Sequence, residues 1–341
     1  MCKPLTKLFG ACCSAALLVG CGSSFSSSTA SPVTPPTTAQ RASHAGSSLP
    51  PPTGADLYVA SYNAVTVYAP GGSSPLRTIE QGIDYPRALA LDGSGNLYVA
   101  NSNGNTVTVY PPGASSPSLT ISQGIGRPYA LAFFSNRLYV ANSSNNTVTV
   151  YPRGGSSPLR TISQGIDYPL ALAFDGPRNL YVANTGNNTV TVYPPGGSSP
   201  LRTISQAVDY PVALAFFANR LYVANVNNDT VTLYPRGGSS LLRTISQGID
   251  YPVALAFDGS RNLYVANPRN NTVTVYAPGG SSPSLTISQG IDDPLALAFA
   301  SKRLYVANFD SNAVTVYLRR GSLERTISQG ITEPIALAFG P

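Results

Sequence analysis

The sequence predicts an all-β fold: a seven-bladed β-propeller of four-stranded blades, closed by pairing of the C-terminal strand with the N-terminal blade. Two observations carry this prediction. The motif "LYVA" recurs seven times at steps of 40 to 42 residues, the length of one blade; it begins at Leu57, Leu97, Leu138, Leu180, Leu221, Leu263 and Leu304. Each unit also contains four short β-branched or aromatic runs bounded by turn residues, and none has a helical period of useful length.

The four runs of each unit can be ordered from the axis outward. The Pro-led run "ALAF" carries small residues, which suits the inner strands because blades converge at the axis. "LYVAN" is then the second strand, "TVTVY" the third and "RTISQ" the outer one. Neither side of "LYVA" is strongly polar, as expected for a sheet that neighbouring blades cover on both faces.

The two ends of the repeat array predict ring closure. No "ALAF" run precedes Leu57, whereas the last such run, Ala336–Phe339, has no partner after it. We therefore expect Ala336–Phe339 to pair with Leu57–Ala60, which leaves no open sheet edge. The alternative is an open array, but that arrangement needs polar capping repeats, and the sequence shows none.

The N-terminal residues predict export and a lipid anchor. Lys3 and Lys7 precede an apolar run that is too short to span a bilayer, so residues 1–20 are interpreted as a signal peptide. The run ends in "LVGC", which resembles a bacterial lipobox and implies acylation, with palmitate, of Cys21. The alternatives are an ordinary signal peptide or an uncleaved anchor. Residues 21–53 are rich in Ser, Thr and Pro and predict a disordered tether before a propeller over 54–341.

These features predict attachment to a membrane through the lipid, on the outer membrane or cell surface of an envelope.

Cysteine and histidine usage limits the chemistry that the domain can perform. All four cysteines lie at or before Cys21, and the one histidine, His44, lies in the tether. The propeller therefore lacks the usual zinc ligands, thiol nucleophile and general base, and we expect it not to be an enzyme and to need no cofactor. The alternative is a lactonase or lyase that uses oxygen-ligated calcium at the axial channel.

The succession of "LYVAN" and "TVTVY" over residues 54–341 resembles the bacterial NHL/YVTN-type seven-bladed propellers. That resemblance implies the fold. It also implies His and metal for the lyases among its relatives, and this sequence has no residues to carry those roles. Because propellers host lyases, lactonases and pure binding modules, the resemblance does not fix a function.

The loop order predicts two unlike faces. We define the top face by the loops that join second to third strands and those that lead from an outer strand to the next inner strand. The other loops form the bottom face. The top loops hold ten carboxylates against three arginines, and the bottom loops fifteen basic residues against five acidic ones. The basic face suits an anionic envelope surface, or serves solubility alone. Nucleic acid is not predicted, because stacking aromatics do not interleave with these charges.

The positions where the repeats differ predict a binding surface on the top face. The residue before the inner-strand proline is tyrosine in four units, arginine in one, and acidic in two; the candidate residues are Tyr85, Tyr168, Tyr210, Tyr251, Arg127, Asp292, Asp293 and Glu333. Rigid aromatics beside charged groups are typical of recognition surfaces. The alternative is that each tyrosine packs over its own blade edge.

An asparagine that ends each "LYVAN" run is interpreted as a turn cap, with contact to sugar hydroxyls as the alternative. The functional prediction is a binding or scaffolding module for an extracellular protein or glycan. The first alternative is the calcium-dependent enzyme, and the second is a structural spacer with no discrete ligand. The sequence predicts no oligomeric state.

Overall fold

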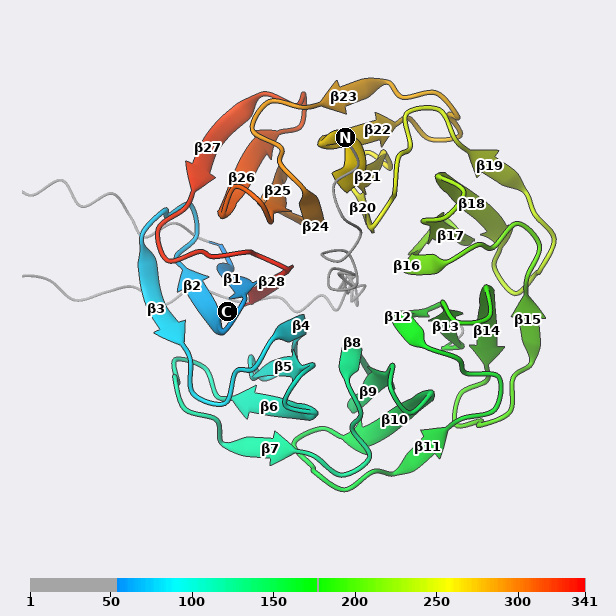
Figure 1. Cartoon of the computed structure of the whole chain (residues 1–341), viewed down its shortest axis with the longest axis horizontal. Helices are drawn as coiled ribbons and strands as arrows, with labels where there is room; N and C mark the ends of the chain where they lie inside the picture. The colour runs from blue at the N-terminus through cyan, green and yellow to red at the C-terminus, as the bar shows by residue number, and fades with distance from the viewer. Residues whose placement is uncertain (1–53, 177, 341) are drawn as a thin grey trace, which may run out of the picture.

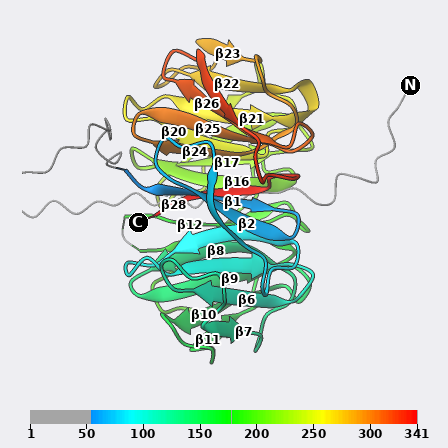
Figure 2. The ribbon, with the colours of Figure 1, turned by 90° about the vertical axis from the view of Figure 1, so that its left-hand side faces the viewer.

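The computed structural model describes residues 54–176 and 178–340, and within them the chain forms a ring of seven four-stranded antiparallel sheets around a central axis (Figure 1). Seen edge-on, the ring is a disc with its blades stacked side by side (Figure 2). The seven-bladed propeller predicted from the repeat is therefore confirmed. The predicted signal peptide, Cys21 and the tether lie outside the described residues.

Each blade is built from the four runs in the predicted order. The inner strands, from blade 1 to blade 7, are β28 (Ala336–Gly340), β4 (Pro86–Leu91), β8 (Pro128–Phe134), β12 (Pro169–Phe174), β16 (Pro211–Phe217), β20 (Ala254–Phe257) and β24 (Pro294–Ala300). The second strands are β1 (Asp56–Ser61), β5 (Leu97–Asn101), β9 (Arg137–Asn142), β13 (Leu180–Asn184), β17 (Arg220–Asn225), β21 (Leu263–Asn267) and β25 (Arg303–Asn308).

The third strands are β2 (Ala64–Tyr68), β6 (Thr106–Tyr110), β10 (Thr147–Pro152), β14 (Thr189–Tyr193), β18 (Thr230–Pro235), β22 (Thr272–Tyr276) and β26 (Ala313–Leu318). The outer strands are β3 (Pro75–Ile79), β7 (Leu119–Ile121), β11 (Arg160–Ile162), β15 (Arg202–Ile204), β19 (Arg243–Ile245), β23 (Leu285–Ile287) and β27 (Leu323–Ile327). A 3₁₀ turn, η2 (Pro268–Asn270), which the sequence did not predict, interrupts the top loop of blade 6.

The ring closes as predicted. Strand β28 pairs with β1 in antiparallel register, with Leu57 opposite Phe339 and Ala60 opposite Ala336. Blade 1 thus takes its inner strand from the end of the chain and its other three from the beginning. The same blade is held at its third strand, where the Tyr68 hydroxyl donates to the Gln329 carbonyl at 2.6 Å.

The tyrosine that ends each third strand has a structural role common to all blades. Its ring is buried, and its hydroxyl donates to a glutamine carbonyl in the loop that leads into the same blade, as Tyr110 does to Gln81 at 2.6 Å. Burial raises the pKa of Tyr68 to about 12, although the Thr66 hydroxyl opposes the shift. Each blade is therefore tied to the segment arriving from its neighbour by a partly buried hydrogen bond.

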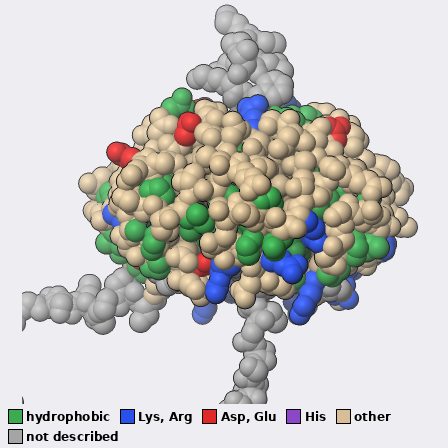
Figure 3. Space-filling model, turned by 90° about the horizontal axis from the view of Figure 1, so that it is seen from below, with side chains coloured by type: hydrophobic (Ala, Val, Ile, Leu, Met, Phe, Trp, Pro, Cys, Tyr) green, Lys and Arg blue, Asp and Glu red, His purple; other side chains and the backbone are tan. Residues whose placement is uncertain are grey.

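Charge divides between the two faces of the disc. Figure 3 views the disc edge-on and shows most of the visible Asp and Glu side chains near one face and most of the visible Lys and Arg side chains near the opposite face. Arg87 is an exception to the predicted division. The loop order predicted it to be one of the three arginines of the top loops, but it belongs to β4 and is only 1% exposed. Among the described residues, no helix is long and apolar enough to cross a membrane.

Candidate functional site

The candidate site is built on one position of each blade, which we call the rim residue: the residue immediately before the proline that begins the inner-strand run. In all seven blades its backbone is left-handed, with φ between 47° and 58°. This conformation is uncommon for residues with a side chain, and a following proline favours extended backbone instead. The surrounding structure must therefore impose it. The rim residues are Tyr85, Arg127, Tyr168, Tyr210, Tyr251, Asp293 and Glu333.

A hydrogen bond from the preceding blade fixes six of the seven rim residues. In each, the backbone N–H donates to the side-chain oxygen of an Asn or Asp in the preceding blade's top turn, at 2.6 to 2.9 Å. In blade 4, for example, Tyr168 N–H donates to Asn146 Oδ1 at 2.9 Å. Tyr85 differs because the blade 1 turn is shorter; there the Tyr62 ring packs edge-on against Tyr85 at 5.4 Å. The rim side chains are thus presented on a frame that spans blade boundaries.

The asparagines that end the second strands support this frame from below. Asn225 is fully buried; its Oδ1 accepts the Asp209 N–H at 3.2 Å, and its Nδ2 donates to Thr232 Oγ1 at 2.9 Å. The same arrangement recurs at Asn101, Asn142, Asn184, Asn267 and Asn308. Their structural role is confirmed, and the alternative of sugar contact is wrong, because all six are 0% exposed.

The rim tyrosines predicted as binding residues are half-buried. Tyr168, Tyr210 and Tyr251 pack against the hydrophobic cluster that runs through blades 5 and 6, and each leaves part of its side chain accessible. In blade 6, the Arg269 guanidinium lies over the Tyr251 ring, 4.8 Å from its centroid. These tyrosines therefore pack on the blade edge and still expose part of their side chains to a ligand.

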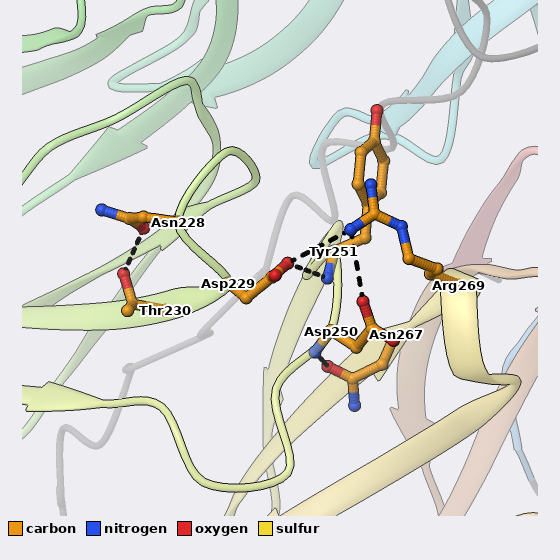
Figure 4. Close-up of polar contacts among 7 residues, drawn as sticks. All are labelled: Asn228, Asp229, Thr230, Asp250, Tyr251, Asn267 and Arg269. Carbon is orange, nitrogen blue, oxygen red and sulfur yellow. Dashed lines mark hydrogen bonds and ion pairs between the residues drawn. The ribbon is translucent and has the colours of Figure 1, made fainter. Parts of the chain in front are cut away.

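Figure 4 shows how charge surrounds Tyr251. The Arg269 Nη1 lies 3.8 Å from Asp229 Oδ1 and 3.5 Å from Asp250 Oδ1, and Asp229 Oδ1 also accepts the Tyr251 N–H at 2.7 Å. The Arg269 side chain is 58% exposed, so these ion pairs add little stability. They hold a cation above an aromatic ring beside two carboxylates, which suits a polar ligand with both donors and acceptors.

The acidic sector of the rim lies in blades 7 and 1. Asp292 Oδ1 accepts from Asn271 Nδ2 at 3.2 Å, and Asp293 donates its N–H to Asn271 Oδ1 at 2.9 Å. Burial raises the pKa of Asp293 to about 6, and the negative charges of Asp310 and Asp292 add to the shift. Glu333 is the rim residue of the closing blade, and its N–H donates to Asn312 Oδ1 at 2.7 Å. Arg127 lies across the ring in blade 3.

Asp293→Asn should stabilise the protein above pH 6. The folded state keeps the Asp293 proton up to about pH 6, whereas the unfolded chain releases it near the ordinary value of 3.8. Protonation of Asp293 stabilises the folded state fully below pH 3.8, and this stabilisation is lost as the pH rises through 6. Because the group is partly exposed, we expect a gain of at most about 1 kcal/mol at pH 7.5. Melting temperatures measured from pH 4 to pH 8 check this.

A control variant tests the stated cause of that shift. Asp310→Asn removes one of the charges that raise the pKa of Asp293, so the midpoint of the wild-type pH dependence should move to lower pH. An Asp293→Asn profile parallel to that of the wild type across this range would contradict the assignment.

A cavity of about 830 Å³ lies along the axis. Leucine, alanine and phenylalanine side chains of all seven inner strands line it, and Asp175 from the blade 4 hairpin is the one carboxylate of the described lining. Asp175 already accepts hydrogen bonds from the Asn179 backbone and side chain at 2.8 and 2.9 Å. Calcium needs six to eight oxygen ligands, and this lining does not offer them. Over 54–176 and 178–340, no three His, Cys, Asp or Glu side chains gather closely enough to hold a metal.

Comparison with known proteins identifies the architecture. No protein-family model matches the chain, and no curated protein is similar to it. Among solved structures, a candidate 6-phosphogluconolactonase from Bacteroides fragilis and a functionally unknown protein from Desulfotomaculum acetoxidans each have a TM-score of 0.71, at 17% and 16% identity, and each match covers 84% of this chain and 98% of that one. The WD40 propeller domain of Doa1 has a TM-score of 0.66 at 14% identity over 78% of this chain and 90% of that one.

These likenesses show the fold alone. At such identities they transfer no activity or ligand, so the NHL/YVTN resemblance stays a prediction, as do the absence of enzymatic activity and the absence of a cofactor.

The sequence also missed one group of residues at the top face: Tyr62, Arg87 and Tyr129, which form aromatic and cation–π contacts across blades 1 to 3. The available signal was that Arg87 and Tyr129 replace the aliphatic residue that follows the rim proline elsewhere.

Proposed function

We propose that this chain is an exported, lipid-anchored propeller that binds an extracellular protein or glycan through the tyrosine sector of its rim. One observation supports it above the others. The rim backbone is fixed by hydrogen bonds between blades, while the rim side chains vary from blade to blade. A rigid frame that presents half-exposed tyrosines gives up little conformational entropy on binding.

The arrangement of charge supports a polar partner. Tyr168, Tyr210 and Tyr251 occupy three consecutive blades, and the carboxylates Asp209, Asp229 and Asp250 lie between them. Neighbouring aromatic rings and carboxylates match the apolar faces and hydroxyl groups of a sugar, or a peptide segment that carries donors. The proposed membrane anchor is the acylated Cys21. Labelling of cells with palmitate checks it: wild type should incorporate the label, and the Cys21→Ala variant should not.

Replacing Tyr168, Tyr210 and Tyr251 with alanine should abolish binding to glycan and envelope-protein arrays while leaving the far-ultraviolet spectrum unchanged. The rings supply the contact area, and their backbone frame does not depend on the side chains. A matched control replaces the exposed Leu159, Leu201 and Leu242, which lie beside the outer strands, with serine and should leave binding intact. Equal binding by wild type and the tyrosine variant would refute the rim as the contact surface.

The alternative of a calcium-dependent lactonase or lyase has the name of one fold neighbour in its favour and the donor set of the axial cavity against it. This alternative can be tested separately, because a bound calcium ion would stabilise the folded state. A melting temperature that is unchanged by a chelator would count against it. The structural spacer is favoured if no array component binds wild type.

A further inference from the structure

A second position of each blade, the residue immediately after the rim proline, forms what we call the collar. In five blades it is aliphatic and buried: Leu170, Val212, Val253, Leu295 and Ile335. In blades 2 and 3 it is Arg87 and Tyr129, which are equally buried, at 1% and 2% exposure. In five of the blades a β-bulge falls at this position, so the collar residue stands out of the regular pairing at the top of the inner strand.

The Arg87 guanidinium is enclosed by aromatic rings and has no hydrogen-bond partner. Its central carbon lies 4.1 Å from the Tyr85 ring centroid and 5.2 Å from that of Tyr129. All three of its nitrogens are buried, and none has a partner among the described residues. A guanidinium carries five N–H donors and stays charged, so leaving it buried and unpaired costs several kcal/mol. The rings stabilise the charge, but they accept none of these N–H bonds in the plane of the group.

A second polar group without a partner lies at the same end of the β4–β5 pair, where the Ser102 N–H donates to the carbonyl of Tyr85, whose ring packs on the guanidinium. Strand β4 begins with Pro86 opposite Asn101; Arg87 follows the first of these residues and Ser102 follows the second. The Ser102 hydroxyl is buried and has no hydrogen-bond partner within the described ranges. The equivalent hydroxyls of blades 3 and 4 are satisfied, since Ser143 donates to the Arg127 carbonyl at 3.0 Å and Thr185 to the Pro211 carbonyl at 2.6 Å. Unlike blades 3 and 4, blade 2 therefore leaves donors unused at this end of both β4 and β5.

The chemistry of the missing partner follows from these donors. A planar guanidinium matches a carboxylate, which can accept two parallel N–H bonds, and the Ser102 hydroxyl at the same end of the strand pair is a further donor. The surroundings are otherwise apolar: the other collar residues are aliphatic, and the axial cavity begins at Leu89, two residues further along β4. If the carboxylate of a ligand bound Arg87, the rest of that ligand would therefore contact aliphatic and aromatic side chains.

We propose that Arg87 and Ser102 form a binding site for an apolar monocarboxylate, with Tyr85 and Tyr129 as its walls. The ligand presents one carboxylate to the guanidinium and an aliphatic body to the collar. Two sources share this chemistry: a free aliphatic acid, and the C-terminus of a polypeptide that ends in an aliphatic residue. The site does not use the tyrosines of blades 4 to 6, so it stands independently of the rim function proposed above.

The test is a titration of the full chain carrying Cys21→Ser, so that no acyl chain of its own competes, by isothermal calorimetry. The probes are octanoate, its neutral counterpart octanamide, and the peptide acetyl-Gly-Leu-Leu with a free or an amidated C-terminus. We expect octanoate to bind at least tenfold more tightly than octanamide, since hydrogen bonds to charged groups are the strong ones. The two peptide forms distinguish a polypeptide source from a free acid: preference for the free-ended peptide over octanoate indicates the former.

Arg87→Leu is the decisive variant because leucine already occupies the collar in blades 4 and 7. It should lose octanoate binding by tenfold or more, and its ligand-free melting temperature should equal or exceed that of wild type, since a buried unpaired charge is removed. Arg137→Ser, an exposed arginine at the start of β9 in the next blade, is the matched control and should bind octanoate as wild type does. Equal octanoate affinity in wild type and Arg87→Leu, or no carboxylate binding by wild type, would overturn the proposal, as would a lower melting temperature of Arg87→Leu with no carboxylate preference.

Discussion

Deleting residues 335–341 should lower the unfolding free energy by about 3 kcal/mol or more, because Ile335 is fully buried and a buried isoleucine alone contributes about 1.5–3 kcal/mol. The deletion also removes the strand that pairs with β1 from Asp56 to Ala60 and the Phe339 ring that packs edge-on against Tyr305. For a domain of this size we expect a fall in melting temperature of roughly 5 to 10 °C. Calorimetry of the full chain and the deletion checks it.

A circular permutant distinguishes the effect of an open ring from the effect of a shorter chain. Moving residues 333–341 to a position directly before Gly54 supplies the same strand to the same sheet by a local hairpin, with residues 341, 54 and 55 as its loop, because Asp56 pairs with Gly340. This chain should recover most of the lost stability, since the β1–β28 register is preserved. Unchanged melting of the deletion, or a permutant no more stable than the deletion, would show that β28 does not close the ring.

Asn225→Ala should cost about 3 kcal/mol, the second largest effect that we expect. The change leaves the Asp209 N–H without its 3.2 Å acceptor and Thr232 Oγ1 without its 2.9 Å donor, inside a fully buried site. Each buried polar group left unpaired costs about 1–3 kcal/mol, and the removed amide leaves a small void. Asp209 directly precedes the rim residue Tyr210, so the variant should also loosen the rim of blade 5.

The matched control for this variant is Asn228→Ala. Asn228 lies in the same top turn but is exposed, and it accepts a hydrogen bond from Thr230 Oγ1 at 2.6 Å. We expect a change below about 0.5 kcal/mol, as for most surface substitutions. Denaturant unfolding of the two variants measures both values, and a similar loss in each would contradict the buried role of Asn225.

The strands and the closure of the ring could be predicted because the same signal recurs seven times. "LYVA" and "TVTVY" are short, β-branched and bounded by turn residues in every unit, so errors at one copy are corrected by the others. Closure followed from counting, since one inner-strand run was missing at Leu57 and one was left over at Ala336. For Asn225 and its equivalents the sequence predicted a structural role as turn caps, but their full burial and their bonds to the loop that enters the blade were not predicted.

The features that shape the candidate site could not be predicted in the same way, because they depend on neighbouring blades. A residue before proline favours extended backbone, so nothing local indicates that Tyr168 is left-handed; its geometry comes from Asn146 in the preceding blade. Arg87 was predicted to be a top-loop charge, and nothing local indicated its burial, because arginine is rarely buried. Its burial results from a β-bulge in its own strand and the Tyr129 ring of the next blade.

A cross-linking measurement tests the closed ring most directly, because the rim and the collar both depend on it. Ala60 and Ala336 lie directly opposite each other in the β1–β28 pair, and neither belongs to the rim or the collar. Peptide mapping after oxidation of the double variant Ala60→Cys, Ala336→Cys should recover an intramolecular disulfide between the peptides of residues 60 and 336. The offset pair Ala60→Cys, Ala338→Cys should form it poorly. Equal yields from the two pairs, or none from the first, would contradict the closure on which the account rests.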